Sequence, residues 1–70
     1  MQPDQENVQL VPMREVMRIA GISRSEIHRR IHRGAFPLPT RLGPRCSRFN
    51  LAEIQEWVRQ RLAERGMKAA

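Results

Sequence analysis

A three-residue break, Gly21-Ile22-Ser23, joins two stretches of helical character and constrains the fold more than any other feature of the chain. Glycine readily adopts the left-handed backbone that ends helices, and serine is a preferred N-cap, so one helix ends at Gly21 and the next begins after Ser23. So short a connection makes the two helices pack against each other at a steep angle. The sequence therefore predicts a helix-turn-helix, with helices over residues 13–20 and 24–33.

The first of these helices combines a proline start with an apolar stripe. We place Pro12 in the first turn, where its missing N–H costs nothing. Upstream, residues 8–11 are compatible with a short strand, and residues 1–7 are polar and slightly acidic, which predicts a flexible tail. The candidate buried side chains of this helix are Val16, Met17, Ile19 and Ala20.

The second helix has one apolar side and one basic side. Ser23 can accept a hydrogen bond from the Glu26 backbone N–H while the Glu26 carboxylate reaches back to Ser23, which is the reciprocal pattern of a capping box. Ile27 and Ile31 fall on one stripe, and Gly34 ends the helix. The opposite side carries Ser25, His28, Arg29, His32 and Arg33. Such a surface suits contacts with phosphates and base edges.

A hairpin is predicted after the second helix. The prolines of Phe36-Pro-Leu-Pro prevent the helix from continuing. Residues 40–42 and 46–49 form the two predicted arms, with Gly43 and Pro44 at the tip. The hairpin carries Arg41, Arg45 and Arg48. A hairpin next to a helix-turn-helix is a wing.

The last helix completes the predicted fold. Asn50 is its expected cap, with Glu53 three residues later, and Gly66 is its expected end, followed by a frayed tail over residues 66–70. Its apolar stripe comprises Leu51, Ile54, Trp57, Val58 and Leu62. The predicted fold class is mainly α with a small β-hairpin: a winged helix-turn-helix of three helices, with the wing between the second and third. It forms one domain over residues 8–65.

The positive charge of the chain is concentrated in its middle third. Residues 24–48 contain seven arginines and one acid, Glu26, so this segment carries a surplus of six charges, equal to the formal net charge of +6 of the whole chain. Twelve of the thirteen basic residues are arginine, whose planar fork suits bidentate contacts to phosphate or guanine. A concentrated surplus of this kind indicates a surface that binds a polyanion.

Length and composition exclude several classes of function. Seventy residues can hardly enclose a substrate, and no nucleophile with a base, carboxylate pair or glycine-rich phosphate loop is present, so we expect no enzyme and no cofactor. His28 and His32 have metal-ligand spacing but no evident third ligand, so we expect no metal site. Low aromatic content favours duplex DNA over single strands. The single cysteine, Cys46, and the lack of an apolar run of about 20 residues suggest a cytoplasmic protein with no membrane association.

The order of these features resembles the AlpA family of small phage and prophage regulators over residues 10–62. The most specific matches are Ile22-Ser-Arg-Ser, Gly34-x-Phe-Pro-x-Pro and Leu42-Gly-Pro-Arg. The resemblance implies a winged helix-turn-helix akin to the DNA-binding domain of MerR regulators and to phage excisionases. The chain departs from the usual family pattern at His28, Arg30 and Phe49, where an aromatic residue, an apolar residue and a tryptophan, respectively, are typical.

The predicted mechanism places the helix over residues 24–33 in the major groove of duplex DNA, with Arg24, Ser25, His28 and Arg29 nearest the bases and His32 and Arg33 on the backbone. The wing enters an adjacent minor groove with Arg45, while Arg41 and Arg48 neutralise phosphates. We expect Arg30 to be half-covered, with its head extending to solvent or paired with an acid on a neighbouring helix.

Three functions fit this prediction. A transcriptional regulator is favoured over an excisionase, which would bend attachment-site DNA together with a phage integrase. A protein-binding adaptor that uses the basic surface is the alternative from another class. A single module of this size buries on the order of 600 to 1,000 Å² of protein surface on DNA, so we expect dimers or side-by-side arrays on repeated sites.

Overall fold

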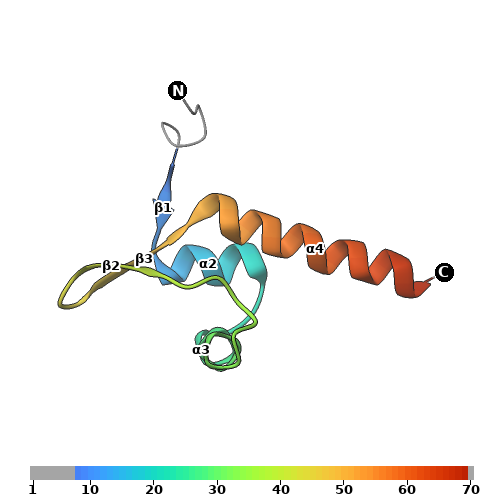
Figure 1. Ribbon diagram of the computed structural model, residues 1–70, viewed down its shortest axis with the longest axis horizontal. Helices are drawn as coiled ribbons and strands as arrows, with labels where there is room; N and C mark the ends of the chain where they lie inside the picture. The colour runs from blue at the N-terminus through green and yellow to red at the C-terminus, as the bar shows by residue number, and fades with distance from the viewer. Residues whose placement is uncertain (1–7, 70) are drawn as a thin grey trace.

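The computed structural model describes residues 8–69, so the predicted tail over residues 1–7 lies outside the described residues. The elements follow one another as β1 (Leu10–Val11), α2 (Met13–Ala20), α3 (Arg24–His32), β2 (Thr40–Gly43), β3 (Cys46–Asn50) and α4 (Leu51–Ala69). In Figure 1, α4 lies above α2, α3 is seen end-on below them, and the β2–β3 hairpin projects away from the far end of α4. The predicted winged helix-turn-helix, with its wing between the second and third helices, is confirmed.

The wing belongs to a three-stranded antiparallel sheet of order β1-β3-β2. The short strand predicted within residues 8–11 is present as β1, and it pairs with β3 so that Val11 lies opposite Phe49. Both side chains are buried. The sequence predicted the hairpin and the short strand but not the pairing between β1 and β3, because this pairing joins segments almost forty residues apart. The strand anchors the base of the wing to the start of α2.

Local capping interactions set the helix ends around the turn. Gly21, at φ 71°, ends α2 and donates its N–H to the Met17 carbonyl at 2.8 Å. Ser23 Oγ accepts from the Glu26 N–H at 3.1 Å, as predicted. Gly34, at φ 73°, ends α3. The prediction for Pro12 is wrong by one position, since it is the N-cap of α2 with an extended backbone rather than a residue of the first turn.

The core lies where α2, α3, α4 and the sheet meet. Its fully buried side chains are Val16, Ile27 and Ile54, one from each helix. Val11, Phe36 and Phe49 are also buried, and the partly buried side chains packed against this core are Met13, Met17, Ile19, Ile22, Ile31, Leu51 and Trp57. The predicted apolar faces of all three helices are therefore confirmed in large part, but Ala20 and Val58 are only half-buried and Leu62 is exposed.

The C-terminal half of α4 differs from prediction in two ways. Leu62 is 54% exposed, and Figure 1 shows that the C-terminal part of α4 extends past the other elements that the structure describes. The helix does not end at Gly66 but continues to Ala69, which glycine permits at a cost of about 1 kcal/mol relative to alanine. Within the described residues, no helix combines the length and apolar character that a membrane span requires.

Trp57 fastens α4 to the segment that leaves α3. Its indole Nε1–H donates to the Ala35 carbonyl at 3.0 Å, and its ring packs edge-on against Phe36 with centroids 4.8 Å apart. Phe36 in turn makes an edge-on contact with Phe49 of β3, at 6.2 Å between centroids. These contacts hold the C-terminal end of α3 in place relative to the wing.

Replacing the cap of α4 is expected to destabilise the protein measurably. Asn50 Oδ1 accepts from the backbone N–H groups of Ala52 at 2.9 Å and Glu53 at 3.4 Å, as its predicted cap role requires. An Asn50→Ala variant leaves these donors without a side-chain partner and should lose about 1 kcal/mol of unfolding free energy in urea denaturation. Asn50→Asp keeps an acceptor and should remain close to wild type, so equal losses in both variants would contradict the capping explanation.

Candidate nucleic-acid interface

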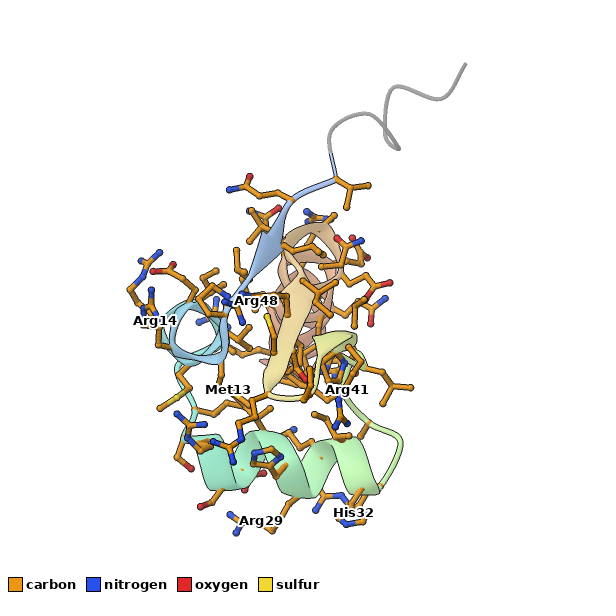
Figure 2. The ribbon with its side chains drawn as sticks, turned by 90° about the vertical axis from the view of Figure 1, so that its left-hand side faces the viewer. Met13, Arg14, Arg29, His32, Arg41 and Arg48 are labelled. Atoms are coloured by element: carbon orange, nitrogen blue, oxygen red, sulfur yellow. The ribbon has the colours of Figure 1, made fainter. Side chains whose placement is uncertain are left out.

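A basic cleft of about 640 Å³ lies between α3, the wing and the start of α2. Six side chains that carry or can carry positive charge line it, from all three elements: Arg14, Arg24, His28, Arg41, Arg45 and Arg48. Its remaining lining is Pro12, Met13, Ile31, Pro39, Pro44, Ser47 and Phe49. Among the residues that the structure describes, no aspartate or glutamate lines this cleft. Figure 2 looks onto this side of the molecule, with α3 across the bottom.

Five of the nine predicted contact residues meet in the basic cleft. They are Arg24 and His28 of α3 and Arg41, Arg45 and Arg48 of the hairpin. The other four, Ser25, Arg29, His32 and Arg33, are exposed at α3 but do not line the cleft. Figure 2 shows Arg29 and His32 on the edge of α3 that faces away from Arg41 and Arg48. The predicted residues therefore occupy the cleft and the adjoining outer face of α3.

Arg14 is a cleft residue that the sequence did not predict. It is an exposed residue in the first turn of α2, outside the arginine-rich segment 24–48. It reaches the cleft because β1 pairs with β3 and carries the start of α2 to the base of the wing. No local pattern signals this arrangement, since it depends on a contact distant in sequence.

The wing presents its arginines on a short, bulged hairpin. Thr40 pairs with Arg48 and Arg41 with Ser47, and an irregularity between Arg41 and Gly43 interrupts the register. Arg41 Nη2 donates to the Pro44 carbonyl at 3.5 Å and Arg48 Nη1 to the Ser47 carbonyl at 2.9 Å, so both side chains lie along the hairpin.

Arg45 lies in the two-residue turn at the tip of the wing and is exposed. Figure 1 shows that the tip of the hairpin projects away from the helices.

Arg30 is partly covered, as predicted, but its acidic partner lies on its own helix. Its Nε lies 2.9 Å from Glu26 Oε2, an ion pair in which the N–H does not point along a hydrogen-bond direction. Its guanidinium lies over the Trp57 ring, 5.5 Å from the centroid. The predicted partner on a neighbouring helix is thus replaced by a carboxylate one turn away.

Glu26 also departs from its predicted capping role. Its Oε1 accepts from Arg29 Nη2 at 2.6 Å, so the carboxylate is turned toward arginines rather than back toward Ser23. The hydrogen bond from Arg29 lowers the pKa of Glu26 below its ordinary value, and the nearby charges of Arg29 and Arg30 lower it further. The carboxylate is therefore charged near neutral pH.

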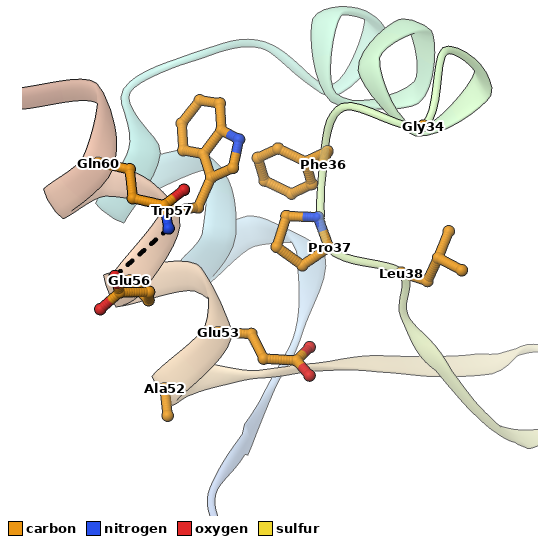
Figure 3. A pocket seen from close by; sticks show the side chains of 9 residues that line it. All are labelled: Gly34, Phe36, Pro37, Leu38, Ala52, Glu53, Glu56, Trp57 and Gln60. Carbon is orange, nitrogen blue, oxygen red and sulfur yellow. Dashed lines mark hydrogen bonds between the residues drawn. The ribbon is translucent and has the colours of Figure 1, made fainter. Parts of the chain in front are cut away.

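A second hollow, of about 650 Å³, lies between the segment after α3 and the first half of α4 (Figure 3). Its floor is apolar, with Phe36, Pro37 and Trp57, but Glu53 and Glu56 line it as well. Two carboxylates disfavour a phosphate backbone, so the basic cleft is the candidate nucleic-acid interface.

The sequence matches a known protein family. The model of the family described as Prophage CP4-57 regulatory protein (AlpA) matches residues 9–62. The chain belongs to the AlpA family. This match covers the helix-turn-helix, the wing and the part of α4 that packs on the core, so the AlpA unit contains the whole basic cleft. No curated protein and no solved structure gives a significant match to the chain.

Proposed function

We propose that this AlpA-family protein is a sequence-specific double-stranded DNA-binding regulator of the phage type. The observation that carries the proposal is the basic cleft, to which α2, α3 and the wing contribute five arginines. The arginines of these three elements share one surface that no acidic residue lines. Such a surface suits the successive phosphates of a nucleic-acid backbone better than a single small anion.

The proposed binding mode follows from the dimensions of the two elements. An α-helix of about 10–12 Å diameter fits the major groove, which is about 12 Å wide, so α3 enters there with its outer face toward the base edges. Ser25, His28 and Arg29 then lie nearest the bases, and His32 and Arg33 approach the backbone. The wing extends toward the adjacent minor groove, where Arg45 is inserted, because a narrow minor groove concentrates negative potential.

A steep salt dependence is the expected result of the primary test. If about five of the arginines on α2, α3 and the wing each neutralise one phosphate, the logarithm of the association constant should fall against the logarithm of salt concentration with a slope of about −4.5. Fluorescence anisotropy with a labelled 30-base-pair duplex measures this slope, and Arg14→Ala should reduce it by about 0.9. No binding at low salt would instead favour a protein-binding adaptor that uses the same surface.

An excisionase is the second candidate, because insertion of Arg45 into the minor groove favours narrowed and bent DNA. Both roles use the same residues and differ in the target. Protection of a promoter in footprinting supports the regulator, whereas protection of an attachment site with bending and integrase recruitment supports the excisionase. Since a single module buries on the order of 600 to 1,000 Å², we also propose that two or more copies bind side by side.

A further inference from the structure

Glu26 is the only acidic residue in the segment 24–48, and it forms ion pairs with two arginines of α3. Its Oε1 lies 2.6 Å from Arg29 Nη2, and its Oε2 lies 2.9 Å from Arg30 Nε. The Glu26 side chain is 25% exposed, whereas that of Arg29 is 62% exposed. A single carboxylate therefore connects a half-covered arginine to one that faces solvent.

The two arginines have different surroundings. Arg30 is anchored on the interior side by the Trp57 ring, and Trp57 is itself tied to Ala35 by the indole hydrogen bond. Arg29 lies on the outer face of α3, on the edge away from the wing (Figure 2). The contacts therefore run outward from Trp57 through Arg30 and Glu26 to Arg29.

We propose that Glu26 is a positioning residue that sets the sequence discrimination of α3 by holding Arg29 in one orientation. One Nη2 donor of Arg29 is bound to the carboxylate, but most of the Arg29 side chain is exposed, so its remaining N–H groups can donate to the O6 and N7 atoms of a guanine. An arginine already held in place loses less side-chain freedom on binding, so the correct base pair is rewarded more strongly. This inference rests on the proposed DNA-binding function.

The same carboxylate weakens binding to DNA of any other sequence. A phosphate that approaches Arg29 has to compete with Glu26 for the guanidinium, and the negative charge of Glu26 repels the phosphate. A guanine edge carries no net charge, so it is not repelled by Glu26 and can accept from Arg29 without displacing the carboxylate. Specificity is a difference between two affinities, so a group that lowers the non-specific one raises discrimination.

The test compares wild type with Glu26→Gln on two probes: random 30-base-pair duplexes and the duplex that wild type enriches from that pool. Glutamine keeps the side-chain length and is accepted at the third position of a helix, so α3 should remain folded. We expect Glu26→Gln to bind random duplex more tightly, with a salt slope steeper by about 0.9 for the freed Arg29. The ratio of selected to random affinity should fall about tenfold.

Glu15→Gln is the matched control. Glu15 Oε1 pairs with Arg18 Nη2 at 2.7 Å in the same three-residue spacing, but on α2 and outside the basic cleft. This variant makes the same change in net charge and weakens an ion pair of the same spacing, and it should leave the affinity ratio unchanged. If the affinity ratio falls equally in the Glu26→Gln and Glu15→Gln variants, a specific role for Glu26 is refuted.

Two variants of Arg29 test whether Glu26 acts through it. Arg29→Lys keeps the charge but lacks the planar fork, so it should lose discrimination while it retains affinity for random duplex. In an Arg29→Ala background, Glu26→Gln should no longer change the affinity ratio. The inference is overturned, and the proposed function stands, if wild type selects a duplex and Glu26→Gln discriminates as well as wild type. If wild type binds no duplex at low salt, both fail.

Discussion

An Arg24→Glu, Arg45→Glu double variant is expected to lose duplex DNA binding while it unfolds at the same temperature as wild type. Both side chains are exposed and line the basic cleft from opposite sides, one on α3 and one at the tip of the wing. Each reversal removes an attraction to phosphate and adds a repulsion, and like charges placed together cost several kcal/mol. We expect affinity at 0.1 M salt to fall by more than about 100-fold in an anisotropy titration.

The control for this variant has to distinguish the effect of where the charges lie from the effect of the total net charge on DNA affinity. Arg18→Glu with Arg65→Glu produces the same change in net charge at two exposed positions outside the basic cleft. If only the net charge of the protein matters, the two double variants should bind DNA with equally reduced affinity. If DNA contacts the cleft directly, the cleft variant should bind much more weakly than the control. A cleft variant that still binds with wild-type affinity would remove the basis for the proposed function.

The largest expected loss of stability follows truncation of Ile27. Its side chain is fully buried in the core to which α2, α3, α4 and the sheet contribute. Ile27→Ala removes the buried branched side chain and leaves a cavity, which should cost about 2 to 5 kcal/mol of unfolding free energy. In a 70-residue domain this corresponds to a drop in Tm of about 10 °C or more in a thermal melt followed by circular dichroism.

Leu62→Ala provides the comparison for an exposed apolar side chain. Leu62 was predicted to extend the buried stripe of α4, but it is 54% exposed. Its truncation should therefore change stability by no more than about 0.5 kcal/mol. A large loss in Leu62→Ala would mean that this residue is covered in solution, and an unchanged Tm for Ile27→Ala would contradict the packing of α3 described above.

The helix ends on either side of the turn, the end of α3 and the start of α4 could be predicted because their determinants are local. Ser23 and Asn50 bond to backbone groups within three residues, and Gly21 and Gly34 adopt a backbone conformation that few other residues tolerate. The arginine-rich segment is equally local, so it yielded five of the six basic or titratable residues that line the cleft. The AlpA motifs, which are contiguous in the chain, predicted the family correctly.

What only the tertiary structure decided concerns contacts between distant segments and the choice between competing partners. The pairing of β1 with β3 brings Arg14 to the basic cleft, and nothing in the sequence around Arg14 indicates it. The Glu26 carboxylate could bond to the Ser23 N–H or pair with Arg29 and Arg30. In the structure it pairs with the two arginines, and Arg30 also lies over the Trp57 ring. Leu62 fits the stripe of α4 but lies beyond its packing partners. The sequence by itself determined where most of the helices start and stop and where charge accumulates, because those features depend on neighbours along the chain; the end of α4, which passes Gly66, is the exception. Which side chains share one surface depended on packing between segments far apart in the chain.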